Sequence, residues 1–78
     1  MSDKRAVDGR DLKAIGRRIR ELRGLDTTQE ELASSLDITQ GLLSRIEHAK
    51  RAPSAAVLRR LHKKYGKSVN WILTGEEK

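Results

Sequence analysis

Apolar residues recur at intervals of three and four along most of this chain, the pattern of helices that bury one face. The first such stripe consists of Leu12, Ile15, Ile19 and Leu22. It predicts a helix over residues 11–23 that Gly24 ends, because glycine adopts the left-handed cap conformation at little cost. No segment alternates apolar and polar residues as a half-buried strand would. The pattern therefore predicts an all-α domain.

Two short helices are predicted next. Thr28 and Glu31 have the spacing of a capping box, which starts a helix over residues 29–36. Asp37 and Ile38 form the turn, and Thr39 is the N-cap of a third helix that ends at about residue 47 or 48.

Two further helices are predicted in the C-terminal half. A basic loop ends at Pro53 and leads into an apolar stripe over residues 54–65, which Gly66 terminates. Ser68 then caps a last helix over residues 69–73, and Gly75 closes it.

The ends of the chain are polar and are expected to be loose. We expect a flexible tail over residues 1–10, a single five-helix domain over residues 11–75, and a frayed end over residues 76–78.

The second and third helices form a unit in which a common set of residues faces inward. This set is Leu32, Ala33, Leu36, Ile38, Leu43 and Ile46. Ala33 matters most, because two helices that cross steeply need a small residue at the crossing. The tight turn between the two helices and the small residue at their crossing together indicate a helix-turn-helix.

The third helix has an outward face without an acidic residue. This face carries Gln40, Gly41, Ser44, Arg45 and His48. Amide and guanidinium groups form paired hydrogen bonds with base edges, and small residues permit close approach. The face is therefore suited to the major groove of double-stranded DNA. Gly41, in a helix interior, is explained equally well by close approach to DNA or by drift.

The formal charge of +6 is unevenly distributed. Residues 24–44 contain no Lys or Arg, whereas the segments on either side are strongly basic. A polyanion is a natural partner for such a surface, although basic helices also serve solubility alone. In the same way, Arg17, Arg18 and Arg20 either reach phosphates or form a solvated helix face.

Several classes of function are not supported by the sequence. There is no cysteine, and the two histidines are far apart, so no metal site and no cofactor are expected. No nucleophile with a partner base and no phosphate loop indicates an enzyme, and no small-molecule pocket is evident. No apolar run has the length of a signal or membrane segment, so we expect a cytoplasmic protein with no membrane partner.

Two runs of the sequence resemble a known family. The run TQEELASSLDITQGLLSRIEHAKRAPS and the closing NWILTG are similar to those of lambda-type phage repressors and Cro proteins, including the regulators of the Xre family. The resemblance covers the chain from about Leu12 to Gly75. It implies a compact lambda-repressor-like fold with the helix-turn-helix at helices two and three.

The resemblance implies DNA contacts by Gln29, Gln40, Ser44 and Arg45, and the other expected contacts follow from their positions on or beside the third helix. Base contacts are expected from Gln40, Gly41, Ser44 and Arg45. Phosphate contacts are expected from Gln29, Thr39, His48, Lys50 and Arg51, the last two because the loop after a recognition helix follows the DNA backbone.

Two departures from the family pattern affect the scaffold. Asp37 stands where the family favours glycine, and aspartate tolerates turn geometry. Glu47 stands where a glutamate pairs with an arginine of the first helix, here Arg23, although the link from Arg23 to Gln29 is one residue shorter than usual.

The function that follows is a sequence-specific transcriptional regulator, a repressor that binds an inverted repeat as a homodimer. The residues expected at the dimer interface are Trp71, Ile72 and Leu73. The alternative is an antitoxin or adaptor that uses the same fold to hold another protein. The tail of three residues after Gly75 counts against it, because antitoxins of this family usually add a longer toxin-binding tail.

Overall fold

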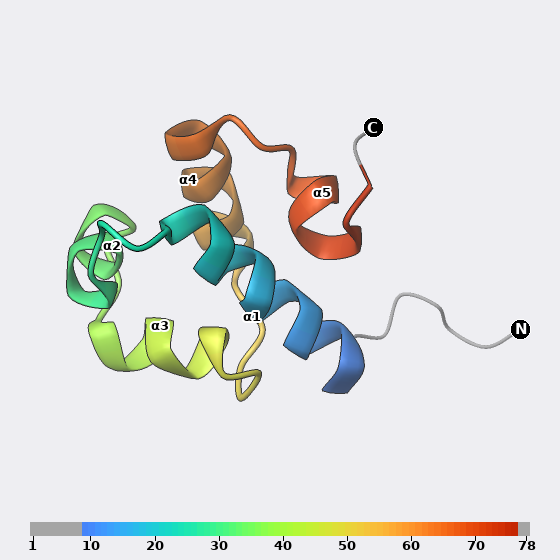
Figure 1. Cartoon of the computed structure of the whole chain (residues 1–78), viewed down its shortest axis with the longest axis horizontal. Helices are drawn as coiled ribbons and strands as arrows, with labels where there is room; N and C mark the ends of the chain where they lie inside the picture. The colour runs from blue at the N-terminus through green and yellow to red at the C-terminus, as the bar shows by residue number, and fades with distance from the viewer. Residues whose placement is uncertain (1–8, 77–78) are drawn as a thin grey trace, which may run out of the picture.

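The computed structural model describes residues 9–76, with side chains from residue 11 onward. The elements are α1 (Gly9–Arg23), α2 (Gln29–Ser35), α3 (Gln40–Glu47), α4 (Ala55–Tyr65) and α5 (Val69–Thr74), arranged as in Figure 1. This part of the chain contains five helices and no strand, which confirms the predicted fold class. Each helix begins and ends within two residues of its predicted bounds.

Four of these helices begin after a hydroxyl residue that caps them, which was predicted for three of them but not for Ser54, expected inside its helix. The residues are Thr28, Thr39, Ser54 and Ser68, and each side-chain oxygen accepts a hydrogen bond from the amide three residues later. At Thr28 the capping box is complete, because the Thr28 amide also donates to Glu31 Oε1 at 2.9 Å. Gly66 and Gly75 end α4 and α5 in the left-handed conformation.

All five helices contribute side chains to one core. Its buried members are Ile15, Ile19, Leu32, Ala33, Leu36, Leu43, Ile46, Val57, Leu58, Leu61 and Ile72. In Figure 1, α1 crosses the middle of the molecule between α3 and α5, and it packs against both. The first helix therefore fixes the position of the third.

Both helices of the helix-turn-helix end in a left-handed residue that is not glycine. These residues are Asp37, with φ of 60°, and Ala49, with φ of 64°. After α3, the amide of Lys50 donates to the Arg45 carbonyl at 2.7 Å, and an equivalent bond follows α2. Aspartate tolerates this conformation, as expected for Asp37, whereas alanine has no local compensation for it.

Three arginines donate to carbonyls at or near the C-terminal ends of three helices. The pairs are Arg18 with Ile72, Arg20 with Glu47, and Arg60 with Leu36. A guanidinium at this position satisfies carbonyls that no amide can reach, and it complements the partial negative charge of the helix end. Arg18 and Arg20 are thus bonded to the backbone of their own chain, whereas Arg17 is paired with the Glu21 side chain on the surface.

The predicted boundary of the N-terminal tail needs correction. Helix α1 already begins at Gly9, so the expected tail over residues 1–10 is at least two residues too long, and residues 1–8 lie outside the described part. The backbone of Glu76 donates to Thr74 Oγ1 and accepts from Asn70 Nδ2. Residues 77–78 lie outside the described part, so the frayed end over residues 76–78 stays a prediction.

Candidate nucleic-acid interface

Helix α3 lies across α2 with its apolar residues inward. Leu43 and Ile46 are buried, and they belong to the same core as Leu32 and Ala33 of α2. Ala33 is 2% exposed, which agrees with its predicted place at the crossing.

The predicted outward face of α3 is open to solvent. Gln40, Gly41, Arg45 and His48 are exposed, and Ser44 is half-buried. A Cβ placed on Gly41 would meet only the Thr39 hydroxyl oxygen, at 4.0 Å. Nothing in the free protein therefore requires glycine at this position.

A chain of hydrogen bonds runs from the inside of the domain to this face. Arg23 donates through Nε and Nη2 to the two carboxylate oxygens of Glu47, both at 2.9 Å. Gln29 Nε2 donates to Glu47 Oε1 at 3.0 Å, and Gln40 Nε2 donates to Gln29 Oε1 at 3.3 Å. The Arg23–Glu47 pair implied by the resemblance is thus present despite the shorter link.

The direction of this chain fixes the orientation of each amide. A carboxylate only accepts hydrogen bonds, so Gln29 must turn its NH₂ group toward Glu47 and its oxygen toward Gln40. Gln40 then directs its own oxygen and one remaining N–H away from the protein. An adenine edge in the major groove offers the matching acceptor N7 and donor N6.

Glu47 is the one buried charged residue among those described, at 2% exposed. Its ion pair with Arg23, together with the Gln29 amide, compensates for the loss of hydration. The hydrogen bond to Glu47 also raises the pKa of Arg23 above its ordinary value. Arg23 donates once more to the Thr27 carbonyl at 3.1 Å, which ties the α1–α2 link to the same pair.

Gly16 of α1, which the sequence analysis did not single out, holds the end of α3 in place. A Cβ at Gly16 would lie 2.5 Å from the Glu47 carbonyl oxygen and 2.8 Å from that of Ile46. The backbone of α1 therefore touches the last turn of α3, which only glycine permits. The feature of the sequence that could have indicated this close contact is a glycine next to the apolar stripe, between Ile15 and Ile19.

The residues expected at phosphates lie around both ends of α3. The Thr39 hydroxyl accepts from the Leu42 amide at 3.1 Å and keeps its own proton free to donate. His48 Nδ1 lies 2.8 Å from the Ser44 carbonyl oxygen, so Nδ1 carries a proton. His48 consequently donates to a phosphate through Nε2 only when both ring nitrogens are protonated. Lys50 and Arg51 are exposed in the loop after α3.

The three residues expected at the dimer interface have different positions. Ile72 is fully buried in the core of the single chain, so it presents no surface to a partner, and its assignment needs correction. Leu73 is 38% exposed, and Trp71 is half-buried beneath Lys67, whose ammonium lies 4.9 Å from the ring centre. The apolar spacing of a six-residue helix did not distinguish its inward residue from its outward ones.

Within residues 9–76, no helix has the length and apolar character needed to cross a bilayer. The same residues include no group of three or more His, Asp or Glu side chains placed to hold a metal ion.

The short helix α3 packs across α2, and hydrogen bonds from within the domain orient the amide on its exposed face. This arrangement defines a helix-turn-helix DNA-binding domain. A family model described as helix-turn-helix matches residues 17–72. The chain belongs to this family, the lambda repressor, Cro and Xre type, and the resemblance seen in the sequence is confirmed. No curated protein and no solved structure matched the chain. The family makes the protein a DNA-binding helix-turn-helix regulator.

Proposed function

We propose that this protein is a transcriptional repressor that binds an inverted repeat as a homodimer, with α3 of each copy in the major groove. The observation that carries the proposal is the hydrogen-bonded chain from Arg23 to Gln40, because it orients a base-reading amide before DNA arrives. The family match favours DNA binding over the adaptor alternative. The closing run NWILTG, common among repressor-like members, supports repression.

The proposed contacts divide along α3. Gln40, Gly41, Ser44 and Arg45 face the bases, and all lie on the acid-free outward face. Residues around this face contact the phosphates, and they are Gln29, Thr39, His48, Lys50 and Arg51. Gln29 contributes the amide hydrogen that it does not donate to Glu47.

Dimerisation brings two such faces to successive turns of the same groove, about 34 Å apart. One α3 reads too few base pairs for high specificity, so a second half-site is needed. We place the dimer contact on α5, through Leu73 and the exposed part of Trp71.

The division of labour is tested on a site selected from random duplex DNA. Gln40→Ala should cost about 1–3 kcal/mol per half-site and relax the preference at one base pair. Lys50→Ala should weaken binding to all sequences alike and lower the salt slope by about one unit per site. Both variants are measured on the selected site and on a single-base variant of it, at two salt concentrations. Equal weakening of both DNAs by Gln40→Ala contradicts the assignment of Gln40 to a base.

The dimer contact is tested by sedimentation of Leu73→Glu. This variant should shift the protein toward monomer, because a carboxylate in an apolar contact is left without a partner. Leu25→Glu is the matched control, since Leu25 is the other large apolar residue exposed among those described, and it lies in the α1–α2 link. A dimer that is unaffected by Leu73→Glu places the interface elsewhere.

A further inference from the structure

A hollow lies between α1 and the C-terminal end of α3. It is lined by Lys13, Arg17, Arg20, Glu47, His48 and Ala49 and encloses about 290 Å³. Lys13, Arg17 and Arg20 are spaced by four and three residues, so they form one stripe along α1. The proposed contacts of α3 do not involve this stripe.

The hollow is electropositive, although one of its walls contains an acidic residue. The Glu47 carboxylate points away from solvent and is bonded to Arg23 and Gln29, and its carbonyl oxygen accepts from Arg20. Lys13 and Arg17 extend from the opposite wall and are exposed. An anion that enters the hollow therefore meets cations and no free carboxylate.

Arg17 makes one weak ion pair that an anion can displace. Arg17 Nε lies 3.8 Å from Glu21 Oε2, and both side chains are about 60% exposed. Exposed pairs of this kind contribute little to stability. Arg18, by contrast, is bonded to the Ile72 carbonyl and faces α5.

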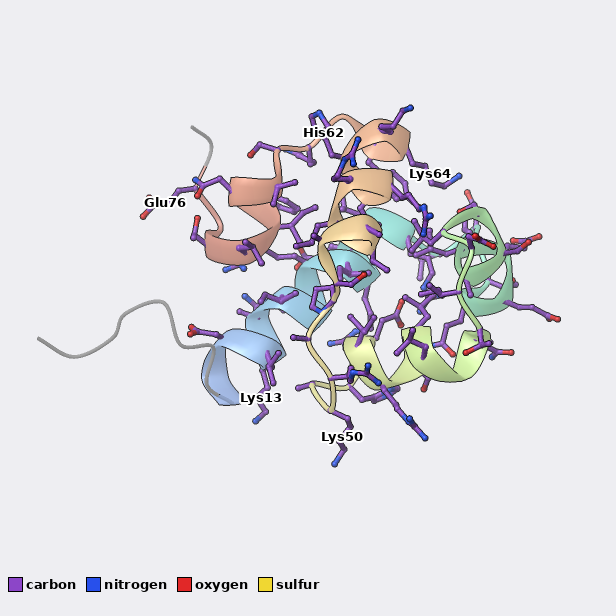
Figure 2. The ribbon with its side chains drawn as sticks, turned by 180° about the vertical axis from the view of Figure 1, so that it is seen from behind. Lys13, Lys50, His62, Lys64 and Glu76 are labelled. Atoms are coloured by element: carbon purple, nitrogen blue, oxygen red, sulfur yellow. The ribbon has the colours of Figure 1, made fainter. Side chains whose placement is uncertain are left out.

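The hollow adjoins the part of the molecule that carries the recognition helix. Figure 2 shows Lys13 and Lys50 projecting from the edge on which α3 lies, whereas His62 and Lys64 project from the opposite edge. The sugar-phosphate backbone flanks any groove that α3 enters. A duplex bound by α3 and the Lys50 loop consequently has a strand close to the Lys13 side of the molecule.

We propose that the DNA-contacting surface extends onto α1, and that Lys13 and Arg17 bind a backbone phosphate of the duplex at this hollow. The inference rests on the proposed function, since it adds a contact to the same complex. Of the basic residues on α1, it assigns Lys13 and Arg17 to DNA, and it assigns Arg18 and Arg20 to the protein's own helix ends.

The test compares two double variants that remove the same charge. Lys13→Ala with Arg17→Ala removes the cations of the hollow. Lys63→Ala with Lys64→Ala removes two cations from exposed positions on the last turn of α4, from which Lys64 projects at the opposite edge in Figure 2. Thermal melting first establishes that both double variants remain folded.

Affinity for the selected site is then measured as a function of salt. The hollow variant should lower the slope of log K against log salt by about one unit per subunit, the value expected for one lost phosphate contact. The α4 variant should leave the slope unchanged. A second measurement is ethylation interference. Ethylation of one phosphate beside each half-site should block DNA binding by the wild-type protein and should have no effect on DNA binding by the hollow variant.

The outcomes separate the inference from the proposed function. Equal slopes for the wild type and the hollow variant, or equal losses in the two double variants, overturn the contact on α1 while DNA binding by α3 stands. A wild-type protein that binds no duplex overturns the proposed function and this contact together.

Discussion

At its first turn α3 offers Gln40 and Gly41 to solvent, whereas at its last turn it buries Glu47 against α1. Gln40 makes one side-chain hydrogen bond, of 3.3 Å, to a neighbouring glutamine. The Glu47 carboxylate accepts three shorter bonds, and the backbone of Glu47 lies against Gly16. The helix is therefore fixed at its last turn, the fixed end, and its exposed first turn, the reading end, is the part proposed to contact bases. Substitutions at the fixed end should act on stability, and substitutions at the reading end should act on DNA.

Glu47→Ala should have the largest effect. It removes the partner of Arg23, releases Gln29 and leaves a space beside the core, so we expect a loss of about 3 kcal/mol in the free energy of unfolding. Urea denaturation measures it. Glu21→Ala removes an ion-paired carboxylate on the surface and should change stability little. Losses of similar size in the two variants contradict the role given to the buried pair.

Gly16→Ala should come next, with a loss of about 2 kcal/mol. A glycine-to-alanine change in an exposed helix interior stabilises by roughly 0.5–1 kcal/mol, so the expected sign here is the reverse. The added Cβ meets backbone oxygens, which cannot rotate away as a side chain would. Stability that rises in this variant contradicts the close contact between the backbones of α1 and α3.

Ala49→Gly should stabilise the fixed end by about 1 kcal/mol, because a left-handed alanine carries a conformational cost that glycine does not. Asp37→Gly, at the equivalent position after α2, is the internal comparison. It should gain less, because aspartate already tolerates this conformation. Thermal melting of the two variants checks the order, and a larger gain at Asp37 reverses the argument.

Gly41→Ala should have the smallest effect on stability, a gain of about 0.5 kcal/mol, since the new methyl group faces open space. The same variant should bind the selected DNA more weakly if the helix backbone approaches the bases closely. Gly41→Ala should therefore raise the stability of the protein and lower its affinity for DNA. Unchanged affinity in a stabilised variant means that Gly41 has no role in DNA contact.

The reading end was predictable from sequence to a greater extent than the fixed end. Thr39, Gln40 and the apolar Leu43–Ile46 spacing are local features, and local capping rules and periodicity place them correctly. Each of these predictions needed only residues within one or two turns.

The fixed end depends on contacts between residues far apart in the chain. Nothing local distinguishes Arg17, which is exposed, from Arg18 and Arg20, which bond to carbonyls of α5 and α3. The need for glycine at Gly16 appears only when α3 is packed against α1. Ile72 was misplaced for the same reason, because the side of α5 that faces inward is set by the other helices.

The central position of α1 has a consequence for how the protein is made. This helix leaves the ribosome first, yet it packs against α3 and α5, which leave later. Until Ile72 emerges, Ile15 and Ile19 have only part of their burying surface, so the domain in a nascent chain stays incompletely assembled until α5 has been synthesised. Arg18 reaches the Ile72 carbonyl only at that last stage. The packing that holds α3 is thus complete only after α5 has emerged, and not when α3 itself has been synthesised.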